Sequence, residues 1–144
     1  MRVLFLDVDG VLNRTGFRPV TSVGLRSWIE PELAGRLSEL LVLTGASVVL
    51  SSDWRIGREL AHLQDELSTA GITCSVVGTT PVLGTERWQE IEAWRSAHRV
   101  GLDAIAIVDD GFDMGPLAPR FVRTSPLNGL DDDAVDALRQ LFGP

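Results

Sequence analysis

The chain has 144 residues, 44% of them hydrophobic and 23% charged, which is ordinary for a globular domain. Its net charge of −7 argues against nonspecific binding to nucleic acid, and no apolar run is long enough to span a bilayer. The start of the chain lacks a signal-peptide pattern, so we expect a cytoplasmic protein. We expect residues 1–144 to form a single domain, and a monomer is compatible with the sequence.

The reactive side chains narrow the possible chemistry further. Cys74 is the only cysteine, which excludes an intramolecular disulfide and a zinc site built from cysteines. All thirteen basic residues are arginines. Arginine suits phosphate binding, but it cannot serve as the amine of a Schiff base.

Buried strands are predicted to alternate with amphipathic helices along the chain. The expected strands are 3–7, 46–50, 72–77, 104–108 and a short edge strand at 120–123. The first helix is expected to open at Pro31 and to end at Gly45. The second helix should span about 56–71. The third should begin after Thr85 and the fourth after Asp131, and these two residues are the predicted N-caps.

This alternation predicts a Rossmann-like, doubly wound α/β fold. Repeated strand–helix units require right-handed crossovers, which give a sheet of about five mainly parallel strands with helices on both faces. Ligands bind such sheets beyond the carboxyl ends of the strands. The ends of the first, second and fourth strands are therefore expected to converge on one crevice.

Asp7 and Asp9 follow the first buried run, and because side chains alternate along a strand they face the same side. Gly10 then allows a sharp turn and a close approach to a ligand. Two acids on one face at the mouth of an α/β sheet indicate metal-assisted chemistry on an anionic group. The alternative is that Asp-Gly simply forms a turn after the strand.

Several motifs resemble those of the haloacid dehalogenase-like (HAD) superfamily. They are DVDGVLN after the first strand, Ser51 after the second, Arg87 at the third helix, and Asp109-Asp110 after the fourth strand. The chain is similar in particular to the small capless phosphatase-like domains, including those of RNA repair proteins. That similarity lies in SSDWR after the second strand, R-x-x-E-I at residues 87–91, and FVRTSPLNGL before the last helix.

The resemblance implies a mechanism for the acidic residues. Asp7 would be the nucleophile that forms an aspartyl phosphate, and Asp9 would be the general acid and base. Mg²⁺ would be held by Asp7, the backbone carbonyl of Asp9 and the acids after the fourth strand. Asp110 is favoured over Asp109 as the direct ligand, and Asp113 is a further candidate.

The remaining motif residues would bind the substrate. Ser51, or Ser52 if the strand end is misplaced by one residue, would donate a hydrogen bond to the phosphoryl oxygens. Arg87 stands where the family more often has lysine and would supply a fixed positive charge. The residues expected at the substrate entrance are Asn13, Trp54 and Arg55. Asn13 is also a candidate support for the metal-binding loop.

The lengths of two loops bear on the substrate. Family members that act on small metabolites usually insert a cap domain after the first motif or after the third strand, but residues 13–30 and 78–85 are too short for one. An open crevice favours a phosphate carried by a large or nucleotide-type substrate, such as a nucleic-acid end. A basic rim is predicted from Arg14, Arg18, Arg26, Arg55 and Arg58. A partner subunit could instead supply a lid for a small metabolite.

Two non-hydrolase readings remain as alternatives. A receiver-type signalling domain would resemble this chain in length and strand–helix order, but it places its acidic pair after the first strand and a lysine after the fifth. Here the pair follows the fourth strand and lysine is absent. A catalytically idle phosphate-binding module is the other alternative, and the intact Asp7 and Asp9 argue against it.

Overall fold

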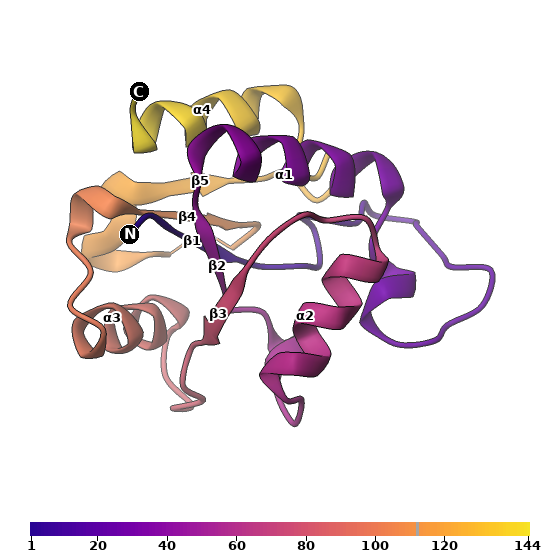
Figure 1. Cartoon of the computed structure of the whole chain (residues 1–144), viewed down its shortest axis with the longest axis horizontal. Coiled ribbons are helices and arrows are strands. Elements are labelled where there is room, and N and C mark those ends of the chain that lie inside the picture. The colour runs from indigo at the N-terminus through magenta and orange to yellow at the C-terminus, as the bar shows by residue number, and fades with distance from the viewer. Residues whose placement is uncertain (112) are drawn as a thin grey trace.

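The computed structural model describes residues 1–111 and 113–144, and its centre is one parallel sheet (Figure 1). The strand order is β3-β2-β1-β4-β5, and each neighbouring pair is parallel. The strands are β1 (Val3–Leu6), β2 (Ser47–Leu50), β3 (Val76–Thr79), β4 (Ile105–Asp109) and β5 (Phe121–Arg123). The predicted Rossmann-like α/β class is confirmed.

Helices cover both faces of the sheet. They are α1 (Pro31–Thr44), α2 (Leu60–Thr69), α3 (Arg87–Ala97) and α4 (Asp132–Phe142). Apolar residues of α1, α2 and α4 share one buried cluster, whereas α3 contributes to a second cluster. Figure 1 shows α1 and α4 side by side over the sheet, with α3 on the other side. In the described part of the chain, no helix combines the length and the apolar character needed to cross a membrane.

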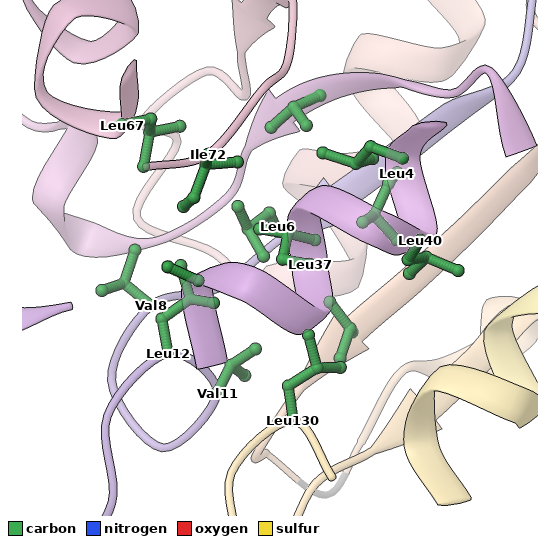
Figure 2. Packing of buried hydrophobic residues seen from close by; sticks show 14 of the residues in the cluster. Leu4, Leu6, Val8, Val11, Leu12, Leu37, Leu40, Leu67, Ile72 and Leu130 are labelled. Carbon is green, nitrogen blue, oxygen red and sulfur yellow. The ribbon is translucent and has the colours of Figure 1, made fainter. Parts of the chain in front are cut away.

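The central strand β1 explains why the start of the sequence is continuously apolar. Leu4 and Leu6 pack into the cluster shared by α1, α2 and α4, where Figure 2 shows them near Leu37 and Leu40. Val3 and Phe5 belong to the opposite cluster, together with residues of α3. All four β1 side chains are fully buried, so each contributes about 1.5–3 kcal/mol of transfer free energy. This burial fixes where β1 ends and therefore where Asp7 lies.

Several predicted boundaries were wrong. The third strand begins at Val76 rather than residue 72, because backbone groups before it bind side chains of other elements: Thr73 N donates to Ser38 Oγ, and the Cys74 carbonyl accepts from Gln64 Nε2. Ile56 lies outside α2 and is 48% exposed.

The N-cap of α3 is Glu86 instead of Thr85, because Glu86 and Gln89 form a reciprocal capping box. The predicted ends of α1 and α4 agree with the structure. Gly45 is the left-handed C-cap of α1, and the Asp131 side chain accepts from Ala134 N at the start of α4.

Candidate active site

The carboxyl ends of β1 and β4 bring three carboxylates together. Asp7 follows β1, Asp109 ends β4, and Asp110 comes next in the chain. One carboxylate oxygen from each lies within 4.8 Å of the others. Asp7 and Asp109 are 6% and 3% exposed, so both negative groups are held away from water. Oxygen atoms at this spacing form a donor set suited to a hard divalent cation.

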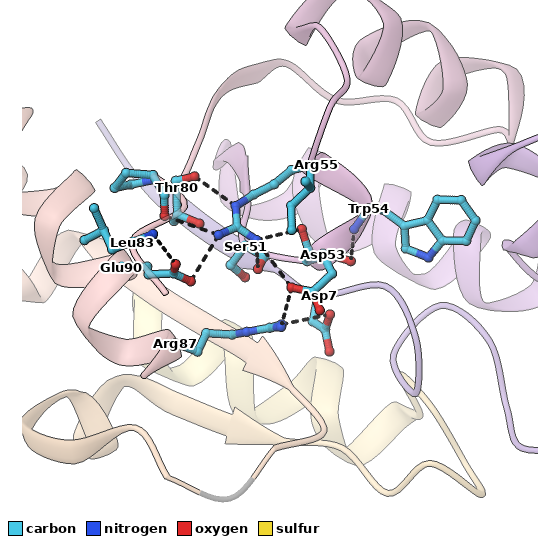
Figure 3. Close-up of polar contacts among 12 residues, drawn as sticks. Asp7, Ser51, Asp53, Trp54, Arg55, Thr80, Leu83, Arg87 and Glu90 are labelled. Atoms are coloured by element: carbon cyan, nitrogen blue, oxygen red, sulfur yellow. Dashed lines mark hydrogen bonds and ion pairs between the residues drawn. The ribbon is translucent and has the colours of Figure 1, made fainter. Parts of the chain in front are cut away.

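Arg87, the first residue of α3, lies between two of these carboxylates. Its Nη1 atom is 3.1 Å from Asp7 Oδ1 and 3.0 Å from Asp109 Oδ2. Its Nη2 atom is 3.5 Å from Asp53 Oδ1, beyond the end of β2 (Figure 3). The fixed geometry of the guanidinium thus bridges the ends of three neighbouring strands.

The concentration of buried negative charge changes the protonation of the site. Burial and, next, the negative charge of Asp109 together raise the pKa of Asp7 to about 8, although Arg87 opposes both effects. Burial also raises the pKa of Asp109, against the lowering effect of Arg87. A single guanidinium is therefore insufficient to offset the burial of both carboxylates, and an added cation would stabilise their ionised forms.

Asp9 has a different environment from Asp7. It is exposed, and its carboxylate accepts hydrogen bonds from two side chains. Asn13 Nδ2 donates to Oδ1 at 2.9 Å, and Trp54 Nε1 lies 3.2 Å from Oδ2 and 3.3 Å from Oδ1. The two predicted catalytic acids therefore differ, one being enclosed beside an arginine and the other open to solvent.

Asn13 is an internal support of this loop and does not line a substrate entrance. It is 8% exposed, its Oδ1 accepts from Gly10 N at 3.1 Å, and its Nδ2 also donates to the Trp28 carbonyl. The expectation that Asn13 lies at the entrance was wrong because its amide is buried and held by three hydrogen bonds. The expectation that it supports the loop agrees with these contacts.

Gly10 allows the loop to pass close to Asp110. Its φ is +80°, and a Cβ atom there would overlap the Asp110 carboxylate. The segment between β5 and α4 holds the same loop from outside: Thr124 Oγ1 donates to Gly10 O and Leu130 N to Val11 O, both at 2.8 Å. The FVRTSPLNGL segment therefore has a structural role, which is to hold the loop that follows β1.

The two serines after β2 have distinct environments. Ser51 is fully buried, and its Oγ has no hydrogen-bond partner among the described residues. Ser52 Oγ already accepts from Trp54 N at 3.2 Å, where it caps the short 3-10 turn η2 (Asp53–Arg55). Because a buried hydroxyl without a partner is costly, Ser51 is the better candidate to bind a ligand.

Arg55 is a structural arginine, and the expectation that it lines the entrance was wrong. Its side chain is 2% exposed and forms an ion pair with Glu90 at 3.0 Å. Its nitrogens also donate to the backbone carbonyls of Ser51, Ser52, Thr80 and Pro81. Figure 3 shows Arg55 between the loops that follow β2 and β3. No local pattern signals this role, because Glu90 lies 35 positions further along the chain.

Residues 3–135 match the family described as the HAD domain in Swiss Army Knife RNA repair proteins. The chain belongs to this family. No curated protein and no solved structure matches it. The predicted resemblance is thereby confirmed over almost the whole chain.

The HAD domain is capless. Residues 13–30, all of which the structure describes, contain only the short 3-10 turn η1 (Leu25–Trp28), and residues 80–86 contain no helix or strand. Neither segment can cover the crevice as a separate domain. Within the described residues, the three clustered carboxylates and Arg87 therefore have no cap domain over them.

The predicted basic rim of the HAD domain was largely wrong. Arg14 pairs with Glu30 and Glu32, and Arg26 with Glu66, so acidic neighbours offset their charges. Arg18 is exposed and donates to the Phe17 carbonyl, and Arg55 is buried. Arg58 is the member of the predicted set that shares a pocket with Asp9 and Asp53, and its guanidinium stacks 4.9 Å from the centre of the Trp54 ring.

Sequence reasoning missed Arg123, which ends β5 beside Asp109 in the sheet. Its Nε atom donates to the Asp110 carbonyl at 3.4 Å. The available signal was its place at the carboxyl end of a strand, next to the strand that carries the acidic pair. Asp113 lies outside the group of three carboxylates, and its Oδ1 accepts from Gly115 N in a turn.

Proposed function

We propose that this HAD domain is a Mg²⁺-dependent phosphomonoesterase that acts through an aspartyl phosphate on Asp7. The observation that carries the proposal is the buried Asp7 carboxylate, placed against Arg87 and near Asp109 and Asp110. The Ser51 hydroxyl, which has no hydrogen-bond partner in the described part of the chain, adds a donor that a phosphoryl oxygen could satisfy. Nucleophile, cation and donor are the parts that phosphoryl transfer requires.

The donor set fits a magnesium ion. Asp7, Asp110 and the Asp9 carbonyl would hold it, with Asp109 placed behind them because both Asp109 oxygens already accept hydrogen bonds, from Arg87 and from Gly111 N. When bound, Mg²⁺ would neutralise the clustered carboxylates and the phosphate charge. It would also favour the ionised Asp7 carboxylate that attack on phosphorus needs.

The side chains divide the reaction among them. Asp7 attacks phosphorus in line with the leaving oxygen while Ser51 and Arg87 donate hydrogen bonds to the phosphoryl oxygens. Asp9 gives its proton to the leaving oxygen as the P–O bond breaks, and it is thereby ionised. It then takes a proton from the water that attacks the aspartyl phosphate, which releases inorganic phosphate and restores Asp7.

The capless crevice favours a phosphate borne on a large or nucleotide-type substrate, such as a nucleic-acid end. The family description, which refers to RNA repair proteins, supports this choice. Arg58 and Arg123, both beside the acidic residues, could contact further phosphates. A small metabolite enclosed by a partner subunit is the competing substrate class.

A phosphate-release screen in the presence of Mg²⁺ tests the proposal. The substrates would be oligonucleotides phosphorylated at either end, nucleoside monophosphates, a phosphopeptide and sugar phosphates. We expect the fastest release from the oligonucleotides or nucleotides, none in EDTA, and loss of release in Asp7→Asn with an unchanged circular dichroism spectrum. Absence of release from every substrate by the parent chain would identify a non-catalytic phosphate-binding module instead.

A further inference from the structure

We propose that Trp54 is a positioning residue that aims the Asp9 carboxyl group at the leaving oxygen. The inference rests on the proposed function, in which Asp9 is the general acid. The indole Nε1 atom lies 3.2 and 3.3 Å from the two Asp9 oxygens. Trp54 comes from the loop after β2 and Asp9 from the loop after β1, so this contact links two separate motifs.

Trp54 is itself held in place, as a positioning residue must be. Its backbone N donates to Ser52 Oγ at 3.2 Å, and its carbonyl accepts from Arg58 Nη1 at 2.9 Å. The Arg58 guanidinium also stacks over the indole ring, 4.9 Å from its centre. Because these contacts fix the backbone and the ring, the N–H group has a defined direction.

Asp9 needs such support because its side chain is exposed. An exposed carboxyl group otherwise samples several rotamers, and a proton donor loses effectiveness when its geometry is not fixed. Asn13 Nδ2 donates to Oδ1 from one side, and the indole donates from the other. When Asp9 is protonated, one oxygen can keep accepting the indole N–H while the other carries the proton.

A pocket beside this carboxyl group gives the leaving group a place. It has a volume of about 290 Å³ and is lined by Asp9, Asp53, Trp54 and Arg58. A leaving group bound there would have its oxygen beside the Asp9 carboxyl group. Trp54 would thus act on bond cleavage to the leaving group and would leave the phosphoryl contacts of Ser51 and Arg87 unchanged.

The leaving-group dependence of kcat/KM tests the role of the indole N–H. Trp54→Phe keeps an aromatic ring beneath Arg58 but removes the donor. We expect kcat/KM to fall at least about tenfold for an alkyl phosphate, whose leaving oxygen needs a proton. For 4-nitrophenyl phosphate, whose leaving group is stable as an anion, the fall should be less than about threefold.

Trp28→Phe is the matched control. The Trp28 indole N–H donates to Ser22 Oγ. The substitution therefore removes an equivalent indole donor that does not contact Asp9. We expect this variant to retain parental kcat/KM with both esters. A uniform loss for both esters in Trp54→Phe, or no loss for either, would overturn the inference. A parent chain inactive on both esters would instead overturn the proposed function.

A second measurement does not depend on the folding of Trp54→Phe. The indole N–H resonance of Trp54 in ¹⁵N-labelled protein is compared between the parent and Asp9→Ala. We expect it to move while the other three tryptophan indole resonances stay close to their parental positions. An unmoved Trp54 resonance would overturn the inference, because the contact that carries it would be absent in solution.

Discussion

The Nη2 atom of Arg55 lies 3.0 Å from Oε1 of Glu90, in an ion pair that is almost completely buried. The other Glu90 oxygen accepts from Leu83 N at 2.8 Å. Arg55 meanwhile donates to the carbonyls of Ser51 and Ser52. The pair therefore joins the loop after β3 and helix α3 to the loop that carries the candidate phosphate-binding serine.

Breaking this pair should be costly. Arg55→Leu leaves the Glu90 carboxylate buried without its cation, so we expect the free energy of unfolding to fall by about 3–5 kcal/mol. Urea denaturation followed by circular dichroism measures the change. Glu32→Gln, which removes the ion pairs of the exposed Glu32 carboxylate with Arg14 and Arg36, should leave stability nearly unchanged. Equal effects of the two substitutions would contradict a structural role for Arg55.

Ser51 and Ser52 should respond oppositely to alanine substitution. Ser51→Ala removes a hydroxyl for which the described residues offer no partner, so stability should stay within about 0.5 kcal/mol while phosphate release slows about a hundredfold. Ser52→Ala removes the cap of η2 and should cost about 1 kcal/mol of stability, with the smaller effect on rate. Parallel unfolding and rate measurements decide the matter, and a greater loss of rate in Ser52→Ala would assign the phosphate contact to Ser52.

The strand ends that build the site could be predicted because buried strands have uninterrupted apolar runs. Leu6 and Leu50 are fully buried, and the first polar residues after them, Asp7 and Ser51, lie at the carboxyl edge of the sheet. The start of β3 could not be predicted in this way. Ile72 is as apolar as a strand residue, but distant side chains bind the backbone that follows it.

The environment of individual charged residues was also beyond local pattern. Arginine is rarely buried, so Arg55 was assigned to the surface, although its partner Glu90 holds it inside. Conversely, Arg14 and Arg26 were predicted at a basic rim, but carboxylates distant in sequence offset their charges. Periodicity indicates which face of an element is buried, whereas these pairings depend on which elements the fold makes neighbours.

Gly10 should tolerate no side chain. Gly10→Ala combines a φ of +80° with overlap on the Asp110 carboxylate, so we expect it to destabilise the fold by about 2–3 kcal/mol. Gly16→Ala is the matched control, because Gly16 has a φ of +90° but open space around its Cβ position. Its cost should be limited to about 1–2 kcal/mol of backbone strain. Thermal unfolding compares them, and equal losses would show that contact with Asp110 adds nothing.

Magnesium should stabilise the folded chain, because a ligand that binds only the folded state raises the free energy of unfolding of the protein. The increase is about 2.7 kcal/mol when the ligand concentration is a hundredfold above Kd. Asp110→Asn removes one carboxylate of the group and should abolish most of the rise in Tm. Asp113→Asn, outside the group, should preserve it. A rise in Tm that survives in Asp110→Asn but not in Asp113→Asn would exchange the two assignments.

In the absence of divalent cations, Asp7 should make stability fall as pH rises. Its pKa of about 8 in the folded chain lies above the ordinary value of 3.8, so the folded state favours the protonated carboxyl group. That preference costs nothing below pH 4, costs progressively more between pH 4 and 8, and levels off above pH 8. Asp7→Asn cannot ionise, so in EDTA it should exceed the parent in stability by a margin that widens across this range. Urea unfolding at pH 4, 6 and 8 measures the margin, and a constant margin would show that Asp7 is not buried as an acid.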